Sequence, residues 1–202
     1  MRIILASKSP RRREILETLG VKFEIITRET DETCEETDPC RLVEELARRK
    51  GEEVLDSLDK NDDFLIISAD TVVACDDPED AGKQIILGKP HNAENSKKML
   101  RLLSGSCHRV VGGICVILCK NGKITREVTH DVTDVWFDEI SDADIDKYVS
   151  TGEPFDKAGA YAIQGAASVF IKGINGNYFN VVGLPVNKLN NLLKDKFGIS
   201  LT

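Results

Sequence analysis

The chain has 202 residues, of which 41% are hydrophobic and 30% charged, and its net charge at pH 7 is −7. This composition excludes a chain that is disordered throughout, and the acidic balance argues against duplex nucleic acid as a partner, because phosphate contacts need a basic face. No apolar run approaches the ~20 residues of a membrane span, and the first residues lack the apolar core of a secretion signal, so we expect a cytoplasmic protein without membrane contact. The six cysteines lack the C-x-x-C spacing of zinc and redox sites, and we expect reduced thiols.

The first half of the chain alternates apolar runs with helical patterns. We expect strands at 3–5, 23–26, 64–69 with a continuation over 71–75, and 84–87. We expect helices at 11–19, from 39 to about 57, and from 93 to 103. Asp38 before Pro39, and Asn92, are typical residues at the start of a helix, and residues 27–38 form an acidic loop.

The second half is richer in strand patterns. Apolar segments at 110–119 and 124–137 flank Asn121-Gly122, which is the strongest short signal for a β-hairpin. Further strands are expected near 169–171 and 179–182. Helices are expected from Ser141 to 150 and after Pro185 to 197. The order of elements predicts an α/β fold with a mixed sheet, in a single domain of two lobes.

A basic cluster interrupts this acidic protein at residues 7–13, which read Ser-Lys-Ser-Pro-Arg-Arg-Arg. The cluster lies where a strand leads into a helix, and cations in the first turn oppose the helix dipole at a cost of about 0.3–1 kcal/mol each. A bound anion reverses that cost, so the cluster indicates a phosphate site. The alternative is a solvated basic turn, or one that pairs with Glu14.

Asp70 follows an apolar strand, where a carboxylate must be paired, bound to a ligand or functional, or else caps a turn. With Glu32 of the acidic loop it could bind a hard cation such as Mg²⁺, although loop carboxylates are often only solvated. Lys50 and Lys89 suit phosphate oxygens, but each alone is more typical of a solvated surface lysine. Gln164, in a segment rich in small residues, offers an amide to a ligand or belongs to a tight turn. Together these groups suggest metal-assisted hydrolysis of a phosphoanhydride, without identifying a nucleotide.

The order of these motifs resembles the Maf family. The resemblance rests on S-x-S-P-R-R at 7–12, A-D-T-V-V at 69–73, G-K-P at 88–90, E-P-F-D-K-A-G-A-Y at 153–161, I-Q-G at 163–165 and V-V-G-L-P at 181–185. It covers nearly the whole chain and implies one pyrophosphatase domain over 1–202. It implies an elongated α/β fold with a central cleft, similar to inosine-triphosphate pyrophosphatases, a divalent cation (Mg²⁺, with Mn²⁺ as alternative) and a homodimer. The implied reaction cuts a nucleoside triphosphate between the α and β phosphates.

The resemblance also assigns roles to residues. It implies phosphate binding by Ser7, Ser9, Arg11 and Arg12, catalysis by Asp70, Lys50 and Lys89, and metal binding by Glu32 and Asp70. It implies that Arg11, Thr71 and Gln164 separate a branch acting on dTTP and UTP, with modified pyrimidine triphosphates as further candidates, from a sister branch acting on 7-methyl-GTP. All three match the dTTP/UTP branch, whereas Ala162 and the long segment 76–83 depart from the usual pattern. The alternatives are 7-methyl-GTP hydrolysis, a nucleotide-binding regulator of cell division that does not turn over, and an interaction scaffold. The complete catalytic set favours the enzyme.

Overall fold

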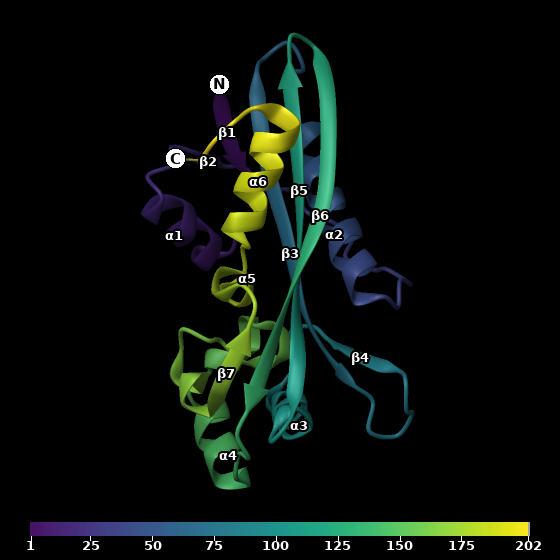
Figure 1. The fold of residues 1–202 in the computed structure, drawn as a ribbon, viewed down its shortest axis with the longest axis vertical. Coiled ribbons are helices and arrows are strands. Elements are labelled where there is room, and N and C mark those ends of the chain that lie inside the picture. Colours follow the sequence, from purple (N-terminus) through teal and green to yellow (C-terminus); the bar gives the residue numbers. More distant parts are fainter. Residues whose placement is uncertain (202) are drawn as a thin grey trace. The chain divides into compact units, whose positions relative to one another are not determined.

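The computed structural model describes residues 1–201 and has an α/β fold (Figure 1). The strands are β1 (Arg2–Leu5), β2 (Glu24–Ile25), β3 (Phe64–Asp76), β4 (Gln84–Leu87), β5 (Cys107–Lys120), β6 (Lys123–Phe137) and β7 (Ile171–Asn175). The α-helices are α1 (Pro10–Thr18), α2 (Pro39–Leu55), α3 (Ala93–Leu103), α4 (Asp142–Ser150), α5 (Tyr178–Val182) and α6 (Val186–Phe197). Three 3₁₀ turns are η1 (Glu153–Asp156), η2 (Ala158–Ala160) and η3 (Ala166–Phe170). The expected α/β class is confirmed.

The strands form a seven-stranded mixed sheet in the order β2-β1-β3-β5-β6-β7, with β4 paired to β3. β1 runs parallel to both β2 and β3, and Leu5 lies opposite Ile67. β4 pairs antiparallel with β3, and β7 pairs antiparallel with β6. Both kinds of pairing were expected from the sequence.

The chain divides into two compact units. Unit 1 contains Met1–Asp70, Gly112–Asp131 and Gly183–Thr202, and unit 2 contains Thr71–Val111 and Val132–Val182. Each boundary but the last falls inside a strand, so β3, β5 and β6 each contribute residues to both units.

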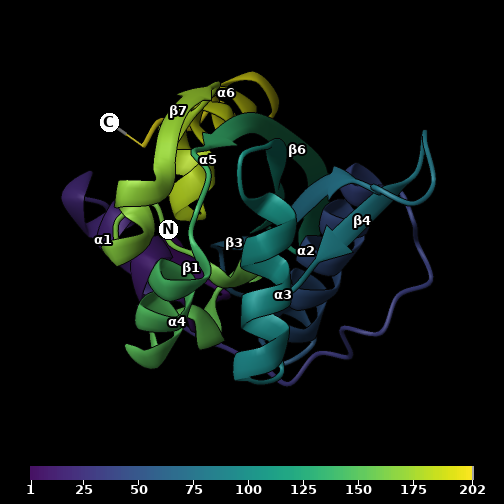
Figure 2. The same ribbon diagram turned by 90° about the horizontal axis from the view of Figure 1, so that it is seen from below.

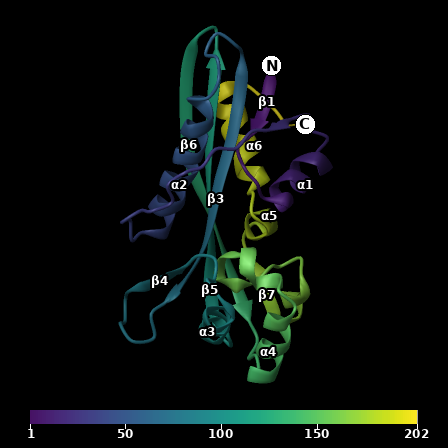
Figure 3. The ribbon, with the colours of Figure 1, turned by 180° about the vertical axis from the view of Figure 1, so that it is seen from behind.

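In unit 1, α2 covers one face of the strands, while α1 and α6 lie on the other face (Figures 1 and 3). The core contains apolar residues of β1, β3, β5 and α2, including Ile4, Phe64 and Val54. A Cβ atom at Gly113 of β5 would overlap the carbonyl group of Val43, so the backbone of α2 lies directly against the sheet. Only glycine permits this approach.

In unit 2, α3 packs against α4 (Figure 2). This unit also contains β4, which pairs with β3, and β7, which pairs with β6 at the end of the strand order. An aromatic cluster of His108, Phe137 and Tyr161 lies in its core. The rings meet edge to face, with distances of 4.8 to 5.3 Å between ring centroids. His108 Nε2 lies 2.8 Å from the Tyr161 hydroxyl, and His108 is 1% exposed.

Local signals predicted most elements correctly. Asp38, Asn92 and Ser141 accept hydrogen bonds from backbone N–H groups of the first helical turn, as expected of capping residues. Asn121 and Gly122 adopt positive φ values of 51° and 74° in the β5–β6 turn, which suits a hairpin with two left-handed residues.

The strand expected at 179–182 is wrong, because this segment is helix α5. The carboxamide oxygen of Asn177 accepts a hydrogen bond from Phe179 N at 3.0 Å, so Asn177 caps the helix. The strand expected near 169–171 begins only at Ile171, after η3. All six cysteines are free thiols, as expected. Within residues 1–201, no helix combines the length and the apolar character that crossing a membrane requires.

Candidate active site

Asp70, Lys50 and Glu32 meet in unit 1. Asp70 lies within β3 and Lys50 on α2, and Lys50 Nζ is 2.5 Å from Asp70 Oδ1. The same ammonium is 2.7 Å from Glu32 Oε1. The side chains of Lys50 and Asp70 are only 19% and 12% exposed, whereas that of Glu32 is 60% exposed. One ammonium therefore holds a buried carboxylate and a loop carboxylate together.

The register between α2 and β3 places Lys50 beside Asp70. The Ser68 hydroxyl, which is buried in β3, donates to the carbonyl oxygen of Ala47 at 2.7 Å. Gly51 faces the same hydroxyl, and a Cβ atom there would come within 2.8 Å of it. Ala47 lies about one helical turn before Lys50, Gly51 follows Lys50 directly, and Ser68 lies two residues before Asp70. These contacts fix both elements against each other.

Arg12 is buried at 9% exposure. Its Nη1 donates to the Ala69 carbonyl oxygen at 2.7 Å and to Ser7 Oγ at 3.1 Å, and its Nε donates to the Gly183 carbonyl oxygen at 2.8 Å. Burial lowers the pKa of Arg12, and the negative charge of Asp70 opposes that shift. Arg12 was expected only as a phosphate-binding cation, but its guanidinium also joins α1 to the backbone next to Asp70.

The other residues expected to bind phosphate lie around the start of α1. Ser7 is buried, and its Oγ accepts a hydrogen bond from Ser9 N at 3.3 Å. Ser9 precedes the first helical residue, and Arg11 is partly buried in the first turn. Arg13 is exposed and lies 3.5 Å from Glu17. The expected strand-to-helix position of the basic cluster is thus confirmed, while phosphate binding there stays a prediction.

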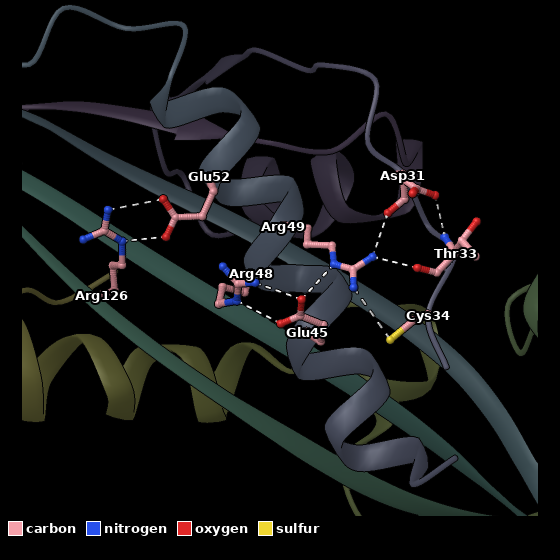
Figure 4. A network of polar contacts seen from close by, with 8 residues as sticks. All are labelled: Asp31, Thr33, Cys34, Glu45, Arg48, Arg49, Glu52 and Arg126. Carbon is pink, nitrogen blue, oxygen red and sulfur yellow. Dashed lines mark hydrogen bonds and ion pairs between the residues drawn. The ribbon is translucent and has the colours of Figure 1, made fainter. Parts of the chain in front are cut away.

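A polar network joins the acidic loop to α2 (Figure 4). Arg49 Nη1 donates to the carbonyl oxygens of Asp31 at 3.2 Å and Thr33 at 2.7 Å. Glu45 accepts from Arg49 Nε at 2.7 Å and from Arg48 at 2.9 and 2.8 Å. The hydrogen bonds from Arg48 contribute most to lowering the pKa of Glu45 to about 2, and burial partly opposes this shift. Arg49 was not among the expected site residues, although three consecutive cations at 48–50 with an acid at 45 were a visible signal.

Lys89, Thr71 and Gln164 belong to unit 2. Lys89 is exposed after β4, next to Gly88, whose carbonyl oxygen accepts from Gly159 N at 3.0 Å. Thr71 follows Asp70 directly in β3. Gln164 is exposed in a turn.

The carboxylate of Glu153 stabilises the turn that carries Gln164. Its Oε2 accepts from Ala166 N at 3.0 Å, and its Oε1 accepts from the Tyr148 hydroxyl at 3.0 Å. A Cβ atom at Gly165 would overlap this carboxylate. Glu153 therefore fixes the backbone directly after Gln164, and packing against its carboxylate requires glycine at 165.

The carboxylates of Glu32 and Asp70 suit a hard cation whose coordination is completed by substrate. No group of three or more His, Cys, Asp or Glu residues within residues 1–201 is arranged to hold a metal ion. Mg²⁺, however, is usually held by one or two carboxylates together with substrate phosphates. Glu32 and Asp70, which share the Lys50 ammonium, match that requirement.

A mixed α/β fold with a basic strand-to-helix turn beside a buried carboxylate–lysine pair is typical of the class of α/β proteins that bind phosphate groups. The family model described as "Maf-like protein" matches residues 2–196, and the chain belongs to the Maf family.

Curated relatives resemble the chain over its whole length. A dTTP/UTP pyrophosphatase of Alkaliphilus metalliredigens is 47% identical over 99% of this chain and 98% of the relative. One from Alkaliphilus oremlandii is 46% identical over 98% of both chains. One from Thermoanaerobacter sp. is 41% identical over 100% of both. The family resemblance expected from the motifs is confirmed.

Proposed function

We propose that this protein is a nucleoside triphosphate pyrophosphatase that hydrolyses dTTP and UTP to the nucleoside monophosphate and pyrophosphate. The observation that carries the proposal is the buried carboxylate of Asp70, held at 2.5 Å by Lys50 next to the basic turn of α1. Full-length relatives that are 41–47% identical and named dTTP/UTP pyrophosphatase support the same reaction and substrates.

In this proposal Asp70 orients or deprotonates the attacking water. Lys50 holds one oxygen of that carboxylate and is available to phosphate oxygens, as is Lys89. Glu32 and Asp70 hold a divalent cation, Mg²⁺ or Mn²⁺, which when bound neutralises charge on the phosphates.

The basic turn binds the triphosphate. Backbone N–H groups at a helix N-terminus and guanidinium groups both suit phosphate oxygens. Arg11 and the Ser7 and Ser9 hydroxyls supply these contacts, together with any Arg12 donors that its carbonyl partners leave available.

In this proposal Gln164, together with Thr71 and Arg11, selects the base of the nucleotide. Uracil and thymine present an N3–H donor between carbonyl acceptors, and a carboxamide matches that pattern with its oxygen and its nitrogen. Cytosine reverses the pattern, and a mispaired buried polar group costs about 1–3 kcal/mol. The expected preference for dTTP and UTP over CTP is therefore roughly 5- to 150-fold.

We further propose that residues 1–202 act as one pyrophosphatase domain, as a homodimer in the cytoplasm. The family model and the relatives, which extend over both compact units, support the single functional domain.

Release of pyrophosphate from a panel of dTTP, UTP, CTP, ATP, GTP and 7-methyl-GTP with Mg²⁺ or Mn²⁺ tests the proposal. Asp70→Asn keeps the size of the side chain but removes its charge, and it should lower turnover at least ~100-fold. The thermal unfolding of Asp70→Asn, which should change little, shows whether the variant is folded. A preference for 7-methyl-GTP would place the chain in the sister branch, and binding without any pyrophosphate release would favour the regulator. Near-normal turnover of Asp70→Asn would remove Asp70 from this role.

A further inference from the structure

Glu32 lies in a part of the chain that regular secondary structure does not hold. It belongs to the segment 26–38, between β2 and α2, and its side chain is 60% exposed. Its carboxylate forms an ion pair with Lys50 of α2. An ion pair with one exposed partner contributes little to holding a loop, because water competes for both charges. This pair therefore adds little to fixing the backbone at Glu32.

Arg49 contacts that backbone on both sides of Glu32. Its Nη1 donates to the carbonyl oxygen of the preceding residue, Asp31, and to that of the following residue, Thr33. Asp31 Oδ1 in turn accepts from Thr33 N at 2.9 Å, which closes a small turn with Glu32 at its centre. Arg49 Nη2 also lies 3.9 Å from the sulfur of Cys34 (Figure 4).

The guanidinium of Arg49 is held in place before it meets the loop. Glu45, one turn earlier on α2, accepts from Arg49 Nε at 2.7 Å. Glu45 also accepts hydrogen bonds from Nε and Nη2 of Arg48 at 2.9 and 2.8 Å. Two neighbouring arginines therefore share one carboxylate, and Arg49 is the one seen to reach the loop.

We propose that Arg49 is a positioning residue, which fastens the 31–33 turn to α2 so that the carboxylate of Glu32 stays beside Lys50 and Asp70. We call the hydrogen bonds from Arg49 to the carbonyl oxygens of Asp31 and Thr33 the clasp. The clasp holds the backbone on both sides of Glu32, while Lys50, the next residue of α2, holds the side chain of Glu32. A preset carboxylate lowers the entropy cost of binding a cation, so the clasp should raise the affinity for the divalent cation. The functional part of this inference rests on the proposed function.

The first experiment measures the clasp without any substrate or metal. The rate of alkylation by iodoacetamide is followed separately at each cysteine by peptide mass spectrometry. Cys34 is the reporter because it is half-buried beside Arg49, and the exposed Cys107 is the internal reference. Arg49→Gln should raise the Cys34 rate relative to Cys107 by about threefold or more, the factor expected for losing hydrogen bonds of ordinary strength.

Two further variants separate geometry from charge. Arg48→Gln removes the same charge from the same helix and breaks the same kind of contact with Glu45, and it should leave the Cys34 rate unchanged. Arg49→Lys keeps the charge, but an ammonium lacks the rigid fork that serves both carbonyl oxygens. Most of the increase at Cys34 should therefore persist in Arg49→Lys. Equal Cys34 rates in Arg49→Gln and Arg48→Gln, or full rescue by lysine, would overturn the clasp.

The second experiment connects the clasp to the cation. In pyrophosphate release from UTP, Arg49→Gln should raise the Mg²⁺ concentration for half-maximal activity by about tenfold, while turnover at saturating Mg²⁺ falls less than threefold. Arg48→Gln should match the wild type in both quantities. An unchanged Mg²⁺ requirement in Arg49→Gln refutes the coupling while leaving the pyrophosphatase assignment intact. If the wild type released no pyrophosphate, the proposed function would fail, and the Cys34 rates would still decide whether Arg49 holds the loop.

Discussion

Replacing Arg12 by methionine tests whether its guanidinium stabilises the fold. Arg12 is 9% exposed and donates to the carbonyl oxygens of Ala69 and Gly183 and to Ser7 Oγ. Methionine keeps much of the volume but donates nothing. If Arg12 served only as a phosphate ligand, removing a cation from the first turn of α1 would stabilise the free protein by about 0.3–1 kcal/mol. The structure predicts the opposite sign.

The magnitude follows from the partners. A hydrogen bond from a charged donor contributes about 1.5–3 kcal/mol, and two backbone acceptors lose such a donor in Arg12→Met. Methionine also removes the cost of keeping a charged group away from water, and this gain offsets part of the loss. We expect a net loss of about 3 kcal/mol, which for a chain of this length lowers Tm by roughly 6–12 °C.

Urea unfolding at pH 7.5, followed by circular dichroism without ligand, measures this loss. Arg13→Met is the matched control, since Arg13 lies next in the same helix and is exposed. It should change stability by no more than about 0.5 kcal/mol. Stability of Arg12→Met equal to or above that of the wild type would refute the structural role and leave only the phosphate-binding one.

Two more predictions concern unit 2. Burial lowers the pKa of His108 to about 4 from 6.5, so the unfolded state binds more protons between these values and stability should fall, by up to about 3 kcal/mol, as the pH drops from 7 to 4. Urea midpoints as a function of pH should show this slope in the wild type and a flatter one in His108→Gln; parallel curves would contradict the neutral buried imidazole. Gly165→Ala should cost about 1–3 kcal/mol in thermal unfolding, because its methyl group displaces the Glu153 carboxylate. In a Glu153→Ala background the same change should cost little, and additive losses would show that the two residues do not compete for this space.

Elements whose signals are local could be predicted from the sequence. Asp38, Asn92 and Ser141 cap helices with their own side chains, and Asn121-Gly122 supplies the positive φ values of a hairpin. The one failed element shows the limit of such signals. The segment 179–182 was expected to be a strand, but it forms helix α5, and Asn177 caps this helix by accepting from Phe179 N.

The sequence allowed us to predict which residue types belong to the candidate site, but few of the contacts that these residues make. The carboxylate of Asp70 and the lysine of Lys50 were visible as chemically capable groups, and the structure brings them together. The burial of Arg12 and the reach of Arg49 were not visible, because their partners are carbonyl oxygens. Every residue carries such an acceptor, so nothing in the amino-acid letters marks the ones that will be used.

The close approach of α2 to the sheet limits where the chain can change its length. An α-helix turns about 100° per residue, so one inserted residue between Val43 and Lys50 would direct the ammonium away from Asp70. Shifting the helix to compensate would bring a side chain to the place where the backbone meets Gly113. The exposed turn at 76–83 carries no such constraint, since residues can be added there without rotating any element of unit 1. Among related chains, length differences should therefore accumulate in that turn and be absent from α2.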